Sequence, residues 1–298
     1  MIPNFPKFKN LESTDKFEIE KFTKAFKPYS DFNFISLWAW DVYCAIKIAK
    51  LNNNLVIRFI DYLSTEPFYS FIGNTQVSDT VNKLLNHSKN EGILPKLKLV
   101  PEQSIENLKA NFQITEDRDN FDYILDTEKL SNLTGPEFHK KRSEINRLLR
   151  DHKLETKIIN IYNENIRIQI QDLNYKWLEE KKRKDPFFNI KNELIAIEKL
   201  LNLQLDCILS IGIFLNNELI AYSINEVSDG IYGTGHFYKA SKYSGLFDYL
   251  IKQSSELLLK NGTLLLNFEQ DLGLMGLRTS KLSFRPSIML KKYIIEPI

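Results

Sequence analysis

The chain has 298 residues, enough for one large domain or two of ordinary size. A composition of 43% hydrophobic and 26% charged residues excludes a disordered protein, and a formal charge of +2 excludes a global cationic field that would attract nucleic acid. The longest uncharged apolar run, residues 207–215, is less than half the roughly 20 residues that span a bilayer. The N-terminus lacks an apolar signal core, so we expect a cytoplasmic protein. The cysteine and histidine spacings match no metal site, and no metal is expected.

The first half is predicted to begin with two short helices and to continue with a hairpin. Asp15 and Glu18 have the spacing of a capping box, and phenylalanines follow at helical intervals. Asn52, Asn53 and Asn54 separate two β-rich runs, which is typical of a hairpin turn. The predicted helices cover 15–27, 34–40, 78–90 and 104–112, and the predicted strands cover 43–48, 55–60, 67–72, 96–100 and 121–125.

The second half repeats this order of elements. Thr134, Gly135 and Pro136 open a basic helix that runs to about residue 150, and Asn216 and Asn217 join another pair of strands. The other predicted helices cover 164–184, 190–202, 244–260 and 272–282, and the strands cover 154–159, 207–215, 218–227, 231–238, 263–267 and 288–295.

Two copies of one element order predict an α/β (α+β) chain of two tandem domains. Within each copy the order is that of the GCN5-related acyltransferase (GNAT) fold, a mixed sheet flanked by helices whose central strands part to admit an acyl donor. We place the domains at 1–126 and 127–298, with the basic helix 136–151 as the link. The first copy is expected to be degenerate and the second to be catalytic.

Three segments resemble a known family. They are FNFISLWAW at 32–40, FDYILDTEKLSNLTGPEFHKKRSEINR at 121–147, and NFEQDLGLMGLRTSKLSFRP at 267–286. Together they are similar to the bacterial family related to the C-terminal domain of phosphatidylglycerol lysyltransferase. The resemblance implies a tandem GNAT-like fold and kinship with the Fem aminoacyltransferases. It also implies transfer of an amino acid from aminoacyl-tRNA, for which the acceptor in the lysyltransferase is a lipid head group.

The C-terminal tail holds the densest group of candidate site residues. Glu269 leaves a strand at its carboxyl end, where ligands of open α/β sheets collect. Asp271 is expected to cap the next helix, and Arg278 and Lys281 lie on one face of it. We expect the two cations to bind a phosphate or carboxylate of donor or acceptor, with Glu269 or Asp271 orienting them or accepting a proton. The alternative is a charge network that only locks strand to helix.

The strand at 231–238 is expected to be the splayed strand of the second copy. Gly233 and Gly235 remove side chains where a donor must approach closely, although such glycines also occur at bulges without a ligand. His236, on the same strand, is a candidate base near the acyl carbonyl, and the alternative is a structural histidine.

The start of the next helix offers a candidate phosphate site. Lys242 and Gly245 are placed where a coenzyme A signature would lie, and we include both among the donor-binding candidates. The bulky Phe247 departs from that signature, which argues against tight capture of a pyrophosphate.

The basic helix is a candidate nucleic-acid contact. Its cations Lys140, Lys141, Arg142 and Arg147 could clasp phosphates of a tRNA acceptor stem. Interspersed acidic residues also allow a solvated, salt-bridged surface.

The leading interpretation is aminoacyl transfer from aminoacyl-tRNA to an amine or hydroxyl, with a small amine, a peptide or a lipid head group as acceptor. No resident cofactor is expected, because acyl-coenzyme A or aminoacyl-tRNA would be the donor substrate. One alternative is an N-acyltransferase that uses acyl-coenzyme A and a small amine. Another is a non-catalytic ligand- or protein-binding module of the same fold.

Overall fold

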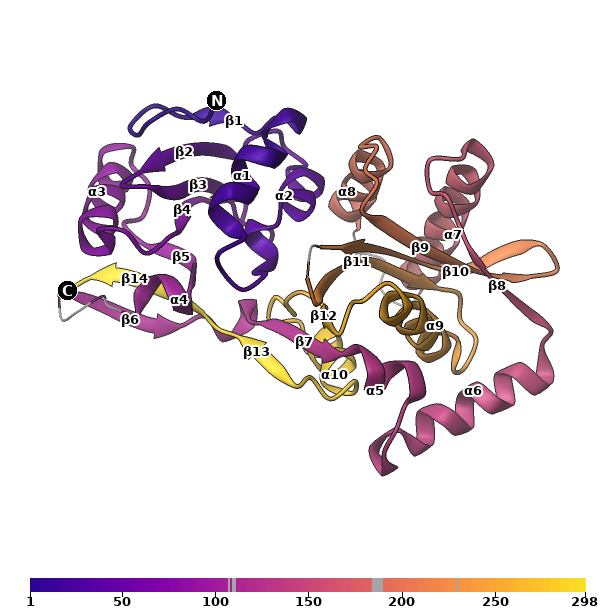
Figure 1. Ribbon diagram of the computed structural model, residues 1–298. Coiled ribbons are helices and arrows are strands. Elements are labelled where there is room, and N and C mark those ends of the chain that lie inside the picture. Colours follow the sequence, from indigo (N-terminus) through magenta and orange to yellow (C-terminus); the bar gives the residue numbers. More distant parts are fainter. Residues whose placement is uncertain (107, 109–110, 184–189, 229) are drawn as a thin grey trace. The chain divides into compact units, whose positions relative to one another are not determined.

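A computed structural model describes residues 1–106, 108, 111–183, 190–228 and 230–298. The chain divides into two compact units, each built around a mixed sheet flanked by helices (Figure 1), which confirms the expected α/β class. The first unit comprises residues 1–123, 269–283 and 288–298, and the second comprises residues 124–268 and 284–287. This division differs from the predicted one, in which everything after residue 126 formed the second domain.

The first unit contains a sheet in the order β1-β2-β3-β4-β5-β14-β6. Its hairpin turns at Asn52 and Asn53, both in the left-handed region, as expected for a two-residue loop. Strands β4 and β5 are parallel, and β14 from the end of the chain runs antiparallel between β5 and β6. The strands of this sheet are β1 (Lys9–Asn10), β2 (Lys47–Leu51), β3 (Asn54–Ile60), β4 (Pro67–Ile72), β5 (Leu97–Pro101), β6 (Phe112–Glu116) and β14 (Lys292–Pro297), and the unit also contains β13 (Ile288–Leu290), which is not part of this sheet.

Short helices surround this sheet, and apolar side chains of α3 pack on it. Val81 and Leu84 of α3 contact a buried cluster that includes Val56, Tyr69 and Ile295 from three strands. The helices are η1 (Ser13–Asp15), α1 (Lys16–Thr23), η2 (Ser30–Phe32), α2 (Phe34–Trp40), α3 (Val77–Asn90), α4 (Glu102–Ile105), η3 (Arg118–Asn120) and α10 (Met275–Leu282).

The second unit contains strands in the order β7-β12-β11-β10-β9-β8. Strand β12 runs parallel to β11 and ends at Asn267, opposite Thr234, whereas β11 continues to Ala240. The pairing of β11 with β12 therefore ends at Thr234, whereas β11 stays paired with β10 up to Ala240. That the two central strands splay apart to admit a donor stays a prediction. The strands are β7 (Asp122–Asp126), β8 (Leu154–Ile158), β9 (Ile208–Leu215), β10 (Glu218–Val227), β11 (Tyr232–Ala240) and β12 (Leu265–Asn267).

The helices of the second unit are α5 (Thr127–Asn132), η4 (Pro136–Phe138), α6 (His139–Asp151), α7 (Glu164–Lys182), α8 (Lys191–Leu201) and α9 (Leu246–Lys260). Two of them, α7 and α9, are the longest helices that the structure describes. Helix α5, which the sequence did not predict, begins at the cap Asp126, whose carboxylate accepts from the Lys129 N–H at 2.9 Å. Among the described residues, no helix combines the length and apolar character that a membrane span requires.

Two predicted helices differ from the structure. Of the predicted helix 104–112, residues 104 and 105 belong to α4 and Phe112 begins β6, which pairs with β14, while residues 107, 109 and 110 lie outside the described part of the chain. Because the partner strand is about 180 residues away, local periodicity could not reveal it. The predicted helix 272–282 begins at Met275 with Leu274 at its N-cap, so Asp271 lies outside the helix and does not cap it.

Candidate active site

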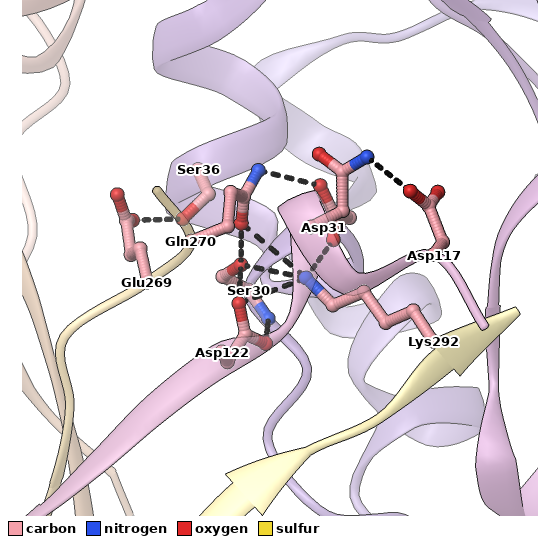
Figure 2. A network of polar contacts seen from close by, with 9 residues as sticks. Ser30, Asp31, Ser36, Asp117, Asp122, Glu269, Gln270 and Lys292 are labelled. Carbon is pink, nitrogen blue, oxygen red and sulfur yellow. Dashed lines mark hydrogen bonds and ion pairs between the residues drawn. The ribbon is translucent and has the colours of Figure 1, made fainter. Parts of the chain in front are cut away.

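A lysine is buried at the start of β14 in the first unit. The Lys292 side chain has 0% exposure, and its Nζ donates to Asp122 Oδ1 at 2.8 Å and to Asp31 Oδ2 (Figure 2). Ser30 binds Asp122 through its N–H at 2.8 Å and its hydroxyl at 2.6 Å. Gln270 Nε2 donates to Asp31 Oδ1 at 3.1 Å. Two carboxylates therefore share one ammonium within a shell of neutral polar groups.

The charges of this centre depend on one another. Burial alone would lower the pKa of Lys292, but the charges of Asp122 and Asp31 outweigh burial and raise that pKa. Burial raises the pKa of Asp31, against the opposing charge of Lys292. Removing one member would leave an uncompensated buried charge, so this group fixes the position of the segments from which it comes.

A second network centres on Asp271. Arg278 binds its carboxylate in bidentate fashion, with Nε at 3.0 Å from Oδ2 and a terminal nitrogen at 2.8 Å from Oδ1. The same terminal nitrogen donates to Asp119 at 2.6 Å, and the hydroxyl of Tyr123 donates to Asp271. Burial alone would raise the pKa of Asp271, but the bonds from Arg278 and Tyr123 hold it below its usual value.

These contacts bear on the predicted anion site. The guanidinium of Arg278 is already bound by Asp271 and Asp119, which favours the alternative that the sequence left open, a network locking the segment before α10 to its neighbours. Asp271 serves as the acceptor for Arg278 and for the N–H of Gly273 at 2.9 Å.

Glu269 and Lys281 do not take part in the network of Asp271 and Arg278. Glu269 Oε1 accepts from the Ser36 hydroxyl at 3.1 Å (Figure 2). Lys281, on α10, is buried, and its Nζ lies 6.0 Å from the centroid of the Tyr123 ring. Burial lowers the pKa of Lys281 to about 8, against the opposing charges of Glu269 and Asp122. A lysine with this pKa is partly a neutral amine near pH 7 to 8, so it can accept a proton.

The chemistry available to the first unit is therefore proton transfer and the stabilisation of charge. Lys281 is the amine that can exchange a proton, and the bonded carboxylates around Lys292 and Arg278 provide a rigid frame. Within the part of the chain that the structure describes, no group of His, Cys, Asp and Glu side chains is placed to hold a metal ion.

The predicted glycines of β11 lie in the second unit, against protein atoms. A Cβ added to Gly235 would come 2.8 Å from a ring carbon of Tyr238 and 3.4 Å from one of Phe268. A Cβ on Gly233 would come 2.9 Å from the Glu226 carbonyl oxygen and 3.0 Å from Thr263. Neighbouring side chains and backbone thus use the space that these glycines leave, which is the packing alternative.

His236 sits at a bulge of the same strand. Ile224 of β10 pairs with Phe237 and Asn225 pairs with Gly235, so His236 is the extra residue. Its side chain is buried, with Nε2 3.4 Å from a carboxylate oxygen of Glu226. The bulge and the acidic partner favour the structural interpretation of this histidine.

The candidate phosphate site also has a packing explanation. Gly245 has φ +82° at the N-cap of α9, and a Cβ there would meet the backbone of Glu144 on α6 at 2.8 Å. Glycine therefore allows the two helices to approach closely. Lys242 is exposed in the loop between β11 and α9, and the Phe247 ring lies 6.1 Å from that of Phe284.

The basic helix α6 divides its cations between internal bonds and solvent. Lys141 pairs with Asp248 at 2.7 Å, and Arg142 donates to the carbonyl of Gly135 at 2.7 Å. Lys140 is 88% exposed, with the carboxylate of Glu144 4.0 Å away. The exposed Arg147 donates to the Ser244 hydroxyl at 3.0 Å and lines a groove of about 490 Å³ along α6, together with His139, Arg142, Ser143, Glu144, Asn146 and Arg150.

Sequence reasoning found the tail residues but missed the centre that surrounds Lys292. Asp122 and Gln270 lie inside the two segments that carry the family resemblance, and Asp31 directly precedes the third. Their place in or next to these segments was the signal in the sequence that could have identified them. Lys292 follows the last segment by several residues, and its role depends on the pairing of β14 with β5 and β6.

Comparisons with known proteins agree with this architecture. Over residues 23–296 the chain matches the family described as phosphatidylglycerol lysyltransferase, C-terminal. A search of curated protein sequences gave no match. A conserved protein of unknown function from Bacteroides thetaiotaomicron VPI-5482 is 25% identical, with 100% of each chain covered and a TM-score of 0.84.

Two further solved structures show the fold. L-PGS from Bacillus licheniformis is 12% identical, with 100% of this chain and 94% of the other covered, and a TM-score of 0.62. FemX is 8% identical, with 98% and 97% covered and a TM-score of 0.57. The chain belongs to the phosphatidylglycerol lysyltransferase C-terminal family and has the GNAT-like fold of acyltransferases.

Proposed function

We propose that the protein transfers an aminoacyl group from an aminoacyl-tRNA to an amine or hydroxyl acceptor. Membership of the lysyltransferase C-terminal family over residues 23–296 supports the reaction class. One observation assigns the proposed reaction to particular residues. Lys281 is buried, and burial lowers its pKa to about 8 against the opposing charge of Glu269.

The proposed step forms one bond at the ester carbonyl and breaks another. The nitrogen or oxygen of the acceptor attacks the carbonyl carbon of the aminoacyl ester, and neutral Lys281 accepts the proton that the acceptor loses. The bond between that carbon and the ribose oxygen of the tRNA then breaks, and the leaving oxygen takes the proton back from the Lys281 ammonium. Glu269 supports the protonated lysine between these events, and no outside reactant is consumed.

The tRNA is proposed to contact α6 of the second unit. Lys140 is exposed there, and Arg147 and Arg150 line the groove of about 490 Å³ along the helix. Exposed cations along a groove suit the phosphates of an acceptor stem. Lys141 and Arg142, which the sequence also offered, make internal bonds and are proposed to hold α6 in place.

An acyl-coenzyme A donor has less support. Gly245 is explained by the close approach of α9 to α6, and the space beside Gly235 contains the rings of Tyr238 and Phe268. A non-catalytic binding module of the same fold is the other alternative, and the transfer assay below distinguishes it from an enzyme.

The direct test is single-turnover transfer with the full chain. The protein is mixed with tRNA carrying radiolabelled amino acids, including lysine, and with three acceptors: a small amine, a peptide, and vesicles containing phosphatidylglycerol. We expect label to leave the tRNA and appear on one acceptor. Acetyl-coenzyme A with the same acceptors is the competing donor, and transfer from it alone would overturn the proposal.

Variants connect the activity to the residues named. Lys281→Met is expected to lower the transfer rate by about a hundredfold, the usual contribution of a general base, and Glu269→Gln by about tenfold. Lys291→Met, which removes an exposed lysine paired with Glu116, is the matched control and should leave the rate unchanged. Wild-type transfer that Lys281→Met does not slow would remove Lys281 from the mechanism.

A further inference from the structure

A cavity of about 640 Å³ opens in the first unit beside the first residues of β4 and β5. Three segments line it, 61–68, 92–99 and 117–120, together with Leu272 and Ile294. Phe68, Leu99 and Ile294 give it apolar walls, and Leu63 and Leu94 stand highly exposed at its edge. The proposed transfer step uses none of these side chains.

Asp117 is the buried polar group of this cavity. Asp117 is only 7% exposed. Its N–H donates to the Lys292 carbonyl at 2.8 Å, and its Oδ1 accepts from Asn120 Nδ2 at 2.8 Å. Figure 2 shows the carboxylate apart from the Lys292 ammonium, bonded through one oxygen to a neighbouring amide. The other oxygen, Oδ2, is buried and has no hydrogen-bond partner among the described residues. Asp117 also forms no ion pair with any residue that the structure describes, so its buried charge has no counter-ion there.

The unbalanced charge of the cavity is negative. Ion pairs account for most of the charged side chains in its wall: Asp61 with Lys98, Lys96 with Glu296 at 3.4 Å, and Asp119 with Arg278 at 2.6 Å. The lining carboxylates left over are Asp117, which is buried, and Glu66, which is exposed and forms no ion pair with any residue that the structure describes. A bound anion would meet these carboxylates, whereas a cation would neutralise them.

A backbone irregularity shapes the same wall. Tyr293 of β14 pairs with Val100 and Ile295 pairs with Leu97, so Ile294 faces an extra residue of β5. Leu99 lies at this bulge with φ +60°, a conformation that a leucine rarely adopts. Bulges re-aim side chains, and here Leu99 and Ile294 both face the cavity.

We propose that this cavity binds a primary ammonium group attached to an apolar body. The ammonium would pair with the carboxylate of Asp117, with Glu66 contributing charge at the edge, and the apolar body would lie against Phe68, Leu99 and Ile294. An ammonium fits because it supplies the positive charge that the wall lacks. The proposal of this binding site does not depend on the proposed transfer reaction.

Binding of a matched pair of small probes to the full chain tests the site. Phenethylamine, protonated at pH 7, and phenethyl alcohol have the same apolar body and differ in the charged donor. By calorimetry we expect the amine to bind at least about tenfold more tightly, as for a charge-assisted hydrogen bond to a buried group. Nα-acetyl-lysine amide is the second arm, since an ammonium could come from a small amine or from a lysine of a peptide.

Substitutions then locate the binding. Asp117→Asn keeps an acceptor for Asn120 and removes the charge, so it should abolish the preference for the amine, and Glu66→Gln should weaken the amine by about threefold or less. Asp79→Asn makes the same change at an exposed position of the same unit and should alter nothing.

Equal affinity for amine and alcohol in the wild-type protein would overturn the site, and so would an undiminished preference for the amine in Asp117→Asn. Absence of amine binding at millimolar concentration would do the same. If Asp117→Asn lowers the thermal midpoint, methyl NMR of the wild-type protein decides instead. The Leu99 and Ile294 signals must then move with the amine and not with the alcohol.

Discussion

The parallel strand pair in the middle of each sheet is built differently in the two units. In the second unit, β11 and β12 are joined by three register pairs, which end at Thr234 opposite Asn267. In the first, β4 and β5 share the single pair of Tyr69 and Leu97. In each unit an antiparallel strand follows the parallel pair, and it comes from the other half of the sequence. In the first unit β14 lies beside β5, and in the second β7 lies beside β12.

The interiors beside these pairs differ in chemistry. In the second unit the rings of Tyr238 and Phe268 lie 5.1 Å apart, next to Gly235. In the first, Lys292 enters on β14 and is met by the carboxylates of Asp31 and Asp122. The comparison teaches that the charged tail belongs to the first unit, although the sequence placed it in the second half. A first copy that looked degenerate acquires its charged centre from the end of the chain.

The largest expected effect tests whether Lys292 holds the first unit together. Replacing it by Met leaves two buried carboxylates without their shared cation, so the free energy of unfolding should fall by about 3 to 5 kcal/mol. Urea unfolding monitored by signals assigned to each unit measures this, and the loss should appear in the first unit. Lys291→Met, at the exposed neighbour, is the control. Equal losses from the two substitutions would show that the buried charges add nothing.

A second prediction concerns the pH dependence of stability that Lys281 gives to the first unit. The pKa of Lys281 is about 8 in the folded chain and 10.5 in the unfolded chain, so between these values the unfolded state binds more protons. Stability from this group therefore rises with pH from about 8 to 10.5, by at most about 3 kcal/mol, and the same amount is lost as pH falls from 10.5 to about 8. The measurement is the difference between wild type and Lys281→Met in urea unfolding from pH 7 to 9.5. Parallel curves would contradict the lowered pKa.

A smaller effect distinguishes the two interpretations of Arg278. Because its guanidinium holds the buried Asp271, Arg278→Ala should lower the thermal midpoint by about 4 °C, and Asp119→Ala, which removes an exposed partner, by about 1 °C. Differential scanning calorimetry measures both. A midpoint that Arg278→Ala leaves unchanged, together with lost binding of aminoacyl-tRNA, would restore the predicted anion site.

Local structure could be predicted from the sequence, whereas the pairing of residues far apart in the chain could not. The hairpin turns at Asn52 and Asn216 and the bounds of β4 and β10 follow from turn chemistry and β-rich composition, and the structure confirms them. The ion pair of Lys292 with Asp122 joins residues 170 positions apart, and no periodicity encodes that contact. The same holds for the assignment of the tail to the first unit. Family resemblance marked the segments around the centre, whereas β-strand register decided which side chains meet.

The smallest expected effect concerns α6, the basic surface of the second unit. If its exposed cations contact phosphates, Arg147→Ala and Arg150→Ala should each weaken tRNA binding about three- to tenfold and reduce the slope of log affinity against log salt by about 1. Lys157→Ala, at an exposed lysine of β8, should leave both quantities unchanged. Filter binding from low to moderate salt measures them. Because Arg142 donates to backbone carbonyls, its substitution should instead lower the stability of the second unit. A slope that depends equally on all four positions would mean diffuse attraction rather than a groove that holds the acceptor stem.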